Sequence, residues 1–207
     1  MTQTHSLEAF RHDESIAALL TDTMQSYSID ERFRDHAESV LYDALTRNVD
    51  LGAQRIAGLA SAAKTLREPE FIYPIPEAHH ALLGVATEER SSFKVERGYI
   101  KGYMDLIFEH AGLSYVLDWK SDTLPIYDAV SVRAHAEANY GIQARLYAIA
   151  LARMLGIKSR EEYERSFGGL VYFFLRSERD EGVYFTRPSF DELRQWEREL
   201  VARESWG

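Results

Sequence analysis

The chain has 207 residues, 45% of them hydrophobic and 28% charged, a composition that fits one globular domain with a substantial core. It contains no cysteine, which excludes disulfide scaffolds, thiolate zinc sites, iron–sulfur clusters and cysteine nucleophiles. Its first residues lack a basic and apolar signal segment, and no apolar run approaches the roughly 20 residues that cross a bilayer, so we expect a soluble cytoplasmic protein with no membrane partner.

The charge is unevenly distributed along the chain. The 24 basic and 33 acidic side chains give a formal net charge of −9, which by itself disfavours binding to nucleic acid. However, residues 1–90 carry 8 basic and 15 acidic side chains, whereas residues 91–207 carry 16 and 18. A polyanionic partner is therefore expected to meet the second part of the chain, helped by metal ions or by a basic partner.

The N-terminal part reads as helical. Hydrophobic residues such as Leu7 and Phe10 recur at helical spacing from residue 7 onward, and the pattern continues to residue 66. Pro69 ends this region, because the residue before a proline disfavours the helical conformation. The sequence thus predicts a helical part over 1–66 and a core over 67–207, within a single domain.

The pattern then changes to a period of two, which indicates strands. Residues 71–76 form a short extended segment that is expected near a sheet edge, because proline cannot donate to a central ladder. Residues 78–92 are predicted as a loop. Two better strands follow at 99–108 and 115–120, and the turn at 110–112 predicts that they pair as a hairpin.

The last third of the chain alternates helix and strand. The clearest helix is predicted over 135–155, with Gly156 as its stop. A buried strand at 168–175 is expected to pair with residues 182–186, and an amphipathic helix over 189–203 follows. This order favours an α/β or α+β domain with a mixed sheet.

The two strands of the hairpin carry the residues with the clearest chemical potential. If they pair, side-chain alternation places Asp105, Asp118 and Lys120 on one side of the sheet. Two carboxylates, with the Trp119 backbone carbonyl between them, are the oxygen ligands that a hard cation such as Mg²⁺ requires. The cation could polarise a phosphodiester, and Lys120 could stabilise the developing negative charge. By pattern alone, the same residues could equally form a charged, solvent-facing strand surface, so this interpretation and the metal site are about equally favoured.

Other motifs exclude several enzyme classes. The sequence has no G-x-S-x-G elbow, no P-loop and no G-x-G-x-x-G fingerprint, so it indicates no serine hydrolase, ATPase or dinucleotide fold. Gly168 and Gly169 are interpreted as a close-packing feature rather than a phosphate loop. Gln143 and Tyr147 lie four apart on the predicted helix and project from one stripe, which alone indicates ordinary helix surface.

Four stretches and one helix nevertheless form a recognisable set. The stretches are EFIYPIPE at 70–77, RGYIKGYMDLIF at 97–108, YVLDWKS at 115–121 and FGGLVYFFLR at 167–176. The helix carries Tyr140, Gln143 and Tyr147, which fit a Gln-x-x-x-Tyr motif. Together, over residues 68–198, they resemble the PD-(D/E)xK nuclease superfamily and, within it, the nuclease domains of the RecB type.

This resemblance implies a fold and a set of roles. The fold would be α/β, with a restriction-endonuclease-like core whose mixed central sheet is flanked by helices. Asp105, Asp118 and the Trp119 carbonyl would bind Mg²⁺, or Mn²⁺ as a substitute, and Lys120 would be the catalytic lysine beside the two aspartates. Four further residues are implied to support the active site or to contact DNA: Lys101, Tyr140, Gln143 and Tyr147.

The metal-binding histidine of the family has no clean counterpart here. The family places it in a Gly-Thr-x-x-His motif, and His5 is the nearest match although the glycine is missing. His36 lies in a similar local sequence but too close to the apolar stretch at 40–45. His5 is therefore the preferred fourth ligand.

The resemblance also implies a function, namely a Mg²⁺-dependent DNA nuclease domain of a RecBCD-type helicase–nuclease, similar to exodeoxyribonuclease V. Such a domain would hydrolyse single-stranded DNA during double-strand break processing and recombinational repair. If the chain is an excised domain, its partners would be a RecB helicase region, RecC- and RecD-type subunits and a RecA-type recombinase. The alternatives are a catalytically silent module of the same fold that docks a recombinase or partner subunit and, less favoured, a phosphohydrolase of small nucleotides.

Overall fold

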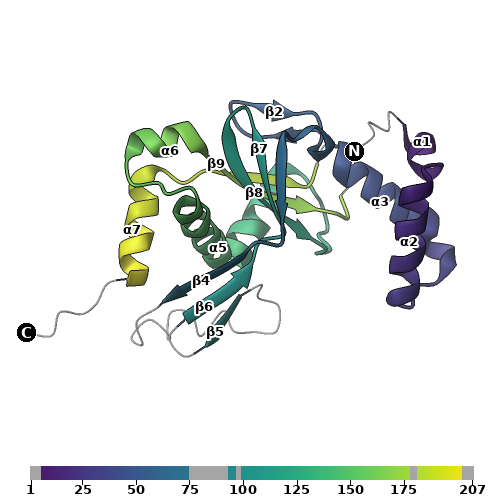
Figure 1. The fold of residues 1–207 in the computed structure, drawn as a ribbon, viewed down its shortest axis with the longest axis horizontal. Helices are drawn as coiled ribbons and strands as arrows, with labels where there is room; N and C mark the ends of the chain where they lie inside the picture. Colours follow the sequence, from purple (N-terminus) through teal and green to yellow (C-terminus); the bar gives the residue numbers. More distant parts are fainter. Residues whose placement is uncertain (1–5, 75–92, 97–98, 178–180, 202–207) are drawn as a thin grey trace, which may run out of the picture.

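The structure is a computed structural model that describes residues 6–74, 93–96, 99–177 and 181–201 (Figure 1). His5 and the predicted loop at 78–92 lie outside the described residues. The described chain forms N-terminal helices, a central sheet with helices packed against it, and a smaller sheet beside α5. The predicted α/β architecture, with a mixed central sheet flanked by helices, is confirmed.

The N-terminal region is helical as far as Thr46. Its helices are α1 (Leu7–Arg11), α2 (Glu14–Ser26), the short 3-10 helix η1 (Glu31–Phe33) and α3 (Arg34–Thr46). The side chains of Ser6, Asp13 and Asp30 accept backbone N–H groups at the first turns, which satisfies donors that a helix start leaves open. The helix prediction is confirmed up to residue 46.

The segment after α3 is extended, so the helix prediction is wrong for residues 49–66. It contains β1 (Val49–Asp50), β2 (Arg55–Ile56), the 3-10 turn η2 (Leu59–Ser61) and β3 (Lys64–Arg67). A helix cannot continue through Gly58, because its φ is 79°, a backbone conformation that favours glycine. The position also has no room for a side chain, since a Cβ there would lie 2.6 Å from the Leu45 carbonyl oxygen. The boundary predicted after residue 66 falls inside β3, which belongs to the central sheet.

The central sheet has the strand order β10-β9-β8-β7-β3. Besides β3, its strands are β7 (Leu106–His110), β8 (Leu113–Lys120), β9 (Phe167–Phe174) and β10 (Val183–Thr186). β8 and β9 run parallel while the other neighbours are antiparallel, which makes the sheet mixed. The predicted pairing of 182–186 with the buried strand is confirmed. Gly168 serves close packing as predicted, because a Cβ there would lie 2.5 Å from the Tyr115 ring.

The strand predicted at 99–108 is wrong as a single strand, because the chain bends at Met104 and Asp105. β6 (Tyr99–Tyr103) lies between β4 (Glu70–Pro74) and β5 (Phe93–Glu96) in a three-stranded sheet, whereas β7 pairs with β8. The chain between β3 and β4 bends at the same level, where Glu68 has a φ of 48° and Pro69 has no N–H. The Met104 N–H donates to the Pro69 carbonyl, and the Glu68 N–H donates to the Asp105 carbonyl. The hairpin prediction is therefore confirmed only for β7 and β8.

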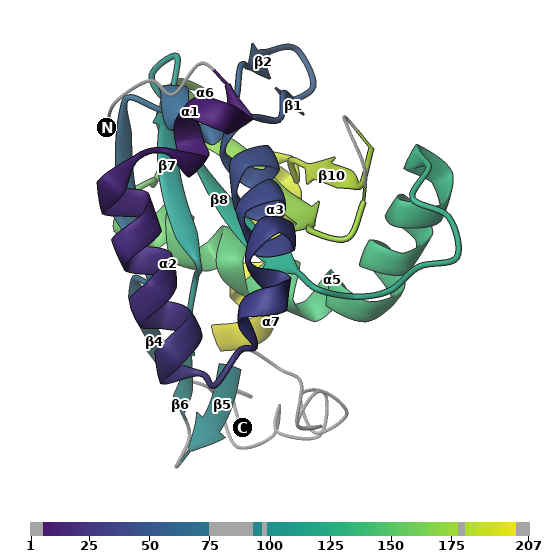
Figure 2. The same ribbon diagram turned by 90° about the vertical axis from the view of Figure 1, so that its right-hand side faces the viewer.

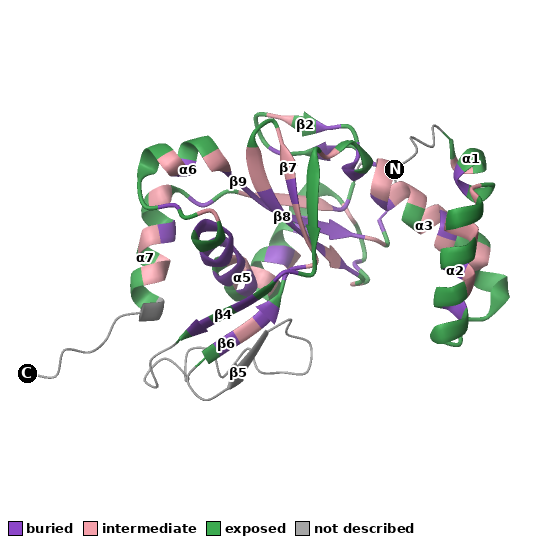
Figure 3. Cartoon of the chain, in the orientation of Figure 1, coloured by how far each residue is buried: buried purple, intermediate pink, exposed green. Residues whose placement is uncertain are grey.

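Two layers cover the central sheet, one on each face. On one face lie α5 (Ala129–Met154), α6 (Arg160–Ser166) and α7 (Phe190–Val201), together with the three-stranded sheet. On the other face lie α3 and the β1–β2 hairpin (Figures 1 and 2). Along β9, Leu170 and Tyr172 face α5, whereas Val171 and Phe173 face the opposite layer. Figure 3 shows that buried residues concentrate on β8, β9 and α5.

The helix α5 is longer than the helix predicted over 135–155. It begins after Asp128, whose side chain accepts the Ser131 N–H, and it ends before Gly156, as predicted. α7 matches the predicted helix at 189–203 over the described residues, and α6 has no counterpart in the prediction. Within the described ranges, no helix is long and apolar enough to cross a membrane.

Candidate active site

The carboxyl end of β8 carries the site, because this central strand presents alternate side chains to the two layers. Asp118 and Lys120 face α5, whereas Leu117 and Trp119 pack into the opposite core, as side-chain alternation predicts. Asp118 and Lys120 are only 3% and 8% exposed. A buried charge is costly unless it is paired, so the contacts of these two groups determine what the site can do.

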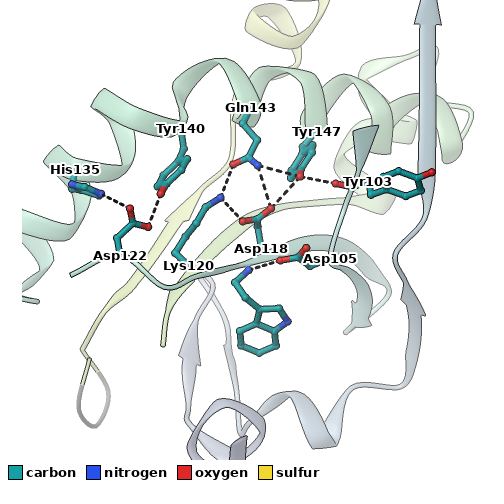
Figure 4. Close-up of polar contacts among 10 residues, drawn as sticks. Tyr103, Asp105, Asp118, Lys120, Asp122, His135, Tyr140, Gln143 and Tyr147 are labelled. Carbon is teal, nitrogen blue, oxygen red and sulfur yellow. Dashed lines mark hydrogen bonds and ion pairs between the residues drawn. The ribbon is translucent and has the colours of Figure 1, made fainter. Parts of the chain in front are cut away.

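Asp118 and Lys120 form an ion pair that α5 completes (Figure 4). The Lys120 Nζ lies 2.5 Å from Asp118 Oδ2 and donates to Gln143 Oε1 at 3.0 Å. The Gln143 Nε2 in turn donates to Asp118 Oδ1 at 3.3 Å. One amide therefore bridges the two charged groups, using its oxygen for the ammonium and its nitrogen for the carboxylate.

Tyr147 connects this pair to the three-stranded sheet. Its hydroxyl accepts from Gln143 Nε2 at 3.1 Å and lies within donating distance of two oxygens, the Tyr103 carbonyl at 2.7 Å and Asp118 Oδ1 at 3.1 Å. The Tyr147 ring packs edge-on against Phe71 of β4. The Gln-x-x-x-Tyr stripe of α5 thus faces the buried charges, and it is not ordinary helix surface.

Aromatic rings enclose the ammonium group. The Lys120 Nζ lies 3.8 Å from the centroid of Tyr140 and 5.5 Å from that of Tyr172. The Tyr140 hydroxyl donates to Asp122 Oδ2 at 2.5 Å, and His135 lies 3.5 Å from the other Asp122 oxygen. These contacts, drawn in Figure 4, hold Tyr140 over the lysine.

Asp105 reaches the site from the bend between β6 and β7. Its Oδ2 accepts the Trp119 N–H at 2.7 Å, which places the carboxylate beside the backbone that follows Asp118 (Figure 4). Partial burial, and then the negative charge of Asp118, raise the pKa of Asp105, whereas the bond from Trp119 lowers it. The two carboxylates are therefore close enough to repel each other.

This donor set suits a divalent cation. Two carboxylates that repel each other are hard oxygen ligands of the kind that Mg²⁺ and Mn²⁺ bind, and the Trp119 carbonyl follows Asp118 on the same strand. Within the residues that the structure describes, no group of three or more His, Cys, Asp or Glu side chains is placed to hold a metal. His36 is exposed on α3, and α3 packs through Ala44 on the face of the sheet opposite α5.

Lys101 belongs to a different cluster. Its Nζ lies 3.1 Å from Glu70 Oε2, and the Tyr103 hydroxyl donates to the same oxygen at 2.8 Å. The cluster lies on β4 and β6 of the three-stranded sheet. The structure thus brings Asp105, Asp118, Lys120 and the three α5 residues together, but it pairs Lys101 with Glu70.

The residues at the site that have no role in the sequence prediction include Tyr103, Asp122 and Tyr172. Asp122 follows Asp118 and Lys120 at the same spacing of two residues, so the sequence alone could have predicted that it lies on the same side of the chain. Tyr172 aligns with Asp118 across the parallel β8–β9 pair, and this register is visible only in the structure. Tyr103 contributes a backbone carbonyl, which no side-chain pattern can reveal.

Comparisons with known proteins agree with this geometry. A family model for the PD-(D/E)XK nuclease superfamily matches residues 7–205. The RecBCD enzyme subunit RecB of Escherichia coli K12 is 39% identical over 107 residues, which cover 47% of this chain and 9% of that protein. The subunit RecB of Borreliella burgdorferi is 29% identical over 171 residues, 74% of this chain and 14% of its own length. That of Haemophilus influenzae is 34% identical over 124 residues, 56% of this chain and 10% of its length.

The matched part of the chain corresponds to a small part of the length of these relatives. The family model covers most of this chain, including the N-terminal helices and the site. The match also covers the bend and β8, which carry Asp105, Asp118 and Lys120. The chain belongs to the PD-(D/E)XK nuclease superfamily, and within it the chain is similar to the nuclease domain of RecB.

Proposed function

We propose that this nuclease domain is Mg²⁺-dependent and hydrolyses phosphodiester bonds of single-stranded DNA. The observation that supports it most strongly is the buried Asp118–Lys120 pair, bridged by Gln143, with the Asp105 carboxylate beside it. A domain used only for docking has no need of buried acids next to a buried lysine, because burying such charges costs free energy.

The metal would be held by Asp105, Asp118 and the Trp119 carbonyl, with His5 as a further ligand. When bound, it would supply Lewis-acid polarisation of the phosphodiester. Because the Lys120 ammonium pairs with Asp118 Oδ2, a ligand role for this carboxylate would place the ammonium beside the metal site and the substrate phosphate.

Lys120 would then act on the reacting groups. An ammonium beside the scissile phosphate can orient the attacking water and stabilise the negative charge that develops in the transition state. Gln143 keeps the amine aligned through its Oε1, and the Tyr140 ring contacts the ammonium. These two residues, with Tyr147, position the chemistry, whereas Lys101 would meet the DNA backbone away from the reacting atoms.

The wider context follows from the similarity to RecB. We infer that the domain works in the cytoplasm within a RecBCD-type helicase–nuclease, in double-strand break processing and recombinational repair, and that it contacts RecC- and RecD-type subunits and a RecA-type recombinase. The net charge of −9 supports this inference, because an acidic domain gains little from capturing DNA alone and suits a strand delivered by its neighbours.

The test is cleavage of end-labelled single-stranded DNA by the purified chain. With Mg²⁺ we expect degradation that EDTA abolishes and that Mn²⁺ restores, and a matched duplex should be cut more slowly. If single strands stay intact at saturating Mg²⁺ and Mn²⁺ although the protein is folded, the silent docking module replaces the nuclease. Cleavage that persists in EDTA would contradict the metal dependence.

A further inference from the structure

A pocket lies beside the candidate active site, on the same face of the sheet. It has a volume of about 170 Å³ and is formed by α5, β9, β10 and α7. In Figure 1, α7 stands next to α5, and the two helices pack against each other. Two of its lining residues, Tyr140 and Tyr172, are the rings that contact Lys120. The pocket and the lysine therefore share a wall.

The walls of the pocket are aromatic. Tyr140 and Tyr172 stack at 5.6 Å with 14° between their planes, and Tyr184 stacks on Tyr172 at 6.2 Å. Trp196 of α7 also lines the pocket, and the guanidinium of Arg145 lies 5.3 Å from the centroid of its ring. These aromatic side chains give the pocket a polarisable apolar wall, which suits a flat ligand.

One lining residue of the pocket, Tyr172, carries a polar group without a partner. The Tyr172 hydroxyl is buried and makes no hydrogen bond within the described residues, although buried hydroxyl groups are normally paired. Since Tyr172 lines the pocket, a ligand that carries ring nitrogens or carbonyl oxygens would give this hydroxyl a partner once the side chain opens toward the pocket. The rim carries opposite charges, with Arg145 and Glu137 exposed.

The size of the pocket limits the ligand to one ring system. An apolar cavity of about 150 Å³ accommodates benzene, whereas drug-sized ligands need pockets of about 300–1,000 Å³. Arg145 at the rim and Arg133, whose guanidinium lies 5.9 Å from the Tyr184 ring, provide positive charge for phosphates next to such a ring. A small flat group with polar edges, attached to phosphates, is a nucleotide.

We propose that this pocket binds one unstacked nucleobase of the DNA strand whose phosphate lies at Lys120. The inference rests on the proposed nuclease function and specifies how the strand is held. Stacking on Tyr184 and Trp196, with a hydrogen bond to Tyr172, would favour a single strand, because a paired base cannot leave its duplex without a free-energy cost.

Gly141 provides a way to fill the pocket without touching the catalytic groups. It lines the pocket, and a Cβ built there meets no atom within 4 Å. Leucine also favours helix more than glycine does, so Gly141→Leu should fold at least as stably as the parent. Ala138→Leu is the matched control, because Ala138 is exposed on the same helix and does not line the pocket.

Binding of a fluorescent single-stranded oligonucleotide is measured in EDTA, so that cleavage plays no part. Gly141→Leu should raise Kd by about 5- to 150-fold, the range that stacking of one base covers, whereas Ala138→Leu should match the parent. Tyr184→Leu, which removes one ring and fills nothing, should raise Kd in the same direction. An abasic substitution at one position of the strand should weaken binding to the parent but not to Gly141→Leu.

Two outcomes separate this inference from the proposed function. If the parent cleaves DNA with Mg²⁺ but Gly141→Leu and Tyr184→Leu bind like Ala138→Leu, the base pocket is wrong and the nuclease stands. Equal tolerance of abasic sites at all positions would overturn the pocket as well. If the parent neither binds nor cleaves single strands, both proposals fall.

Discussion

The two sides of the candidate site differ in how completely their polar atoms are engaged. On the β8–α5 side, Asp118 and Lys120 contact each other, and Gln143 and Tyr147 complete their hydrogen bonds. On the β7 side, partial burial and then the negative charge of Asp118 raise the pKa of Asp105, although its carboxylate accepts the Trp119 N–H. The charges on the β8–α5 side are paired within the protein, whereas the β7 side carries a partly buried carboxylate next to another negative charge.

This difference indicates a division of labour. The β8–α5 side is organised in advance, which keeps the lysine and its amide support in fixed positions before substrate arrives. Asp105 lies in a bend, where partial burial destabilises its charged form. A divalent cation between Asp105 and Asp118 would remove the repulsion, so metal binding should affect the β7 side most.

The largest effect is expected from Asp118→Ala, which removes a ligand and the counter-ion of Lys120. Cleavage and metal binding should be lost together. The free energy of unfolding should fall by about 3–5 kcal/mol, because a buried lysine is left without its partner. Urea denaturation and a cleavage assay check these effects, and Asp118→Asn provides a better-folded second variant. Asp22→Asn, on the exposed surface of α2, is the control, and retained activity in Asp118→Asn would contradict a ligand role.

Asp105→Asn should separate activity from stability. Cleavage should fall by about 10²-fold or more, since a charged contact at the reaction centre is lost. A carboxyl whose pKa is raised on folding favours the folded state while it is protonated, and this contribution is lost as the pH rises through the raised pKa. The metal-free variant should therefore melt at a higher temperature than the parent at pH 8, and the difference should shrink toward pH 4.

The control for the melting temperatures of Asp105→Asn and the parent is to repeat both measurements with bound metal. Saturating Mn²⁺ should raise the melting temperature of the parent and leave Asp105→Asn nearly unchanged. For a domain of this size, the melting temperature shifts by about 2–4 °C for each kcal/mol of change in the free energy of unfolding, and calorimetry resolves such a shift. A variant that melts below the metal-free parent at pH 8 would show that the Asp105 charge is not destabilising.

A smaller effect is expected from Tyr147→Phe. The change removes a hydroxyl that contacts the Tyr103 carbonyl and Asp118, so the free energy of unfolding should fall by about 1–3 kcal/mol. Cleavage should slow less than in either carboxylate variant, because the hydroxyl positions Asp118 and does not touch the reacting atoms. Tyr27→Phe, at a side chain 77% exposed, is the matched control, and an equal effect of the two would contradict the positioning role.

The sequence predicts the local structure of the β8–α5 side better than that of the β7 side. Alternation along one strand was enough to place Asp118 and Lys120 opposite Trp119, because β8 is a regular central strand. Asp105 lies beside this pair, but the sequence predicts it on a single strand at 99–108, whereas the chain bends at Met104. The bend depends on pairing with Glu68 and Pro69, a contact distant in sequence.

Tertiary register explains the other differences. Tyr172 reaches Lys120 only because β8 and β9 align Asp118 with Tyr172. The extended segment at 49–66 follows from Gly58 and from the pairing of β3 with β7, which override a helical pattern of apolar residues. A role for His5 stays a prediction, because that residue lies outside the described part of the chain.

The most direct test of the account is the rate at which Lys120→Ala cleaves single-stranded DNA at saturating Mg²⁺, with Lys158→Ala, an exposed lysine, as control. Lys120 is proposed to act on the attacking water and the developing negative charge, and not to bind the metal. The cleavage rate should therefore fall by about 10²–10³-fold. Mn²⁺ should still raise the melting temperature, because Asp118 no longer pairs with the ammonium. Cleavage by Lys120→Ala at the parental rate would contradict the assignment of β8 as the catalytic strand.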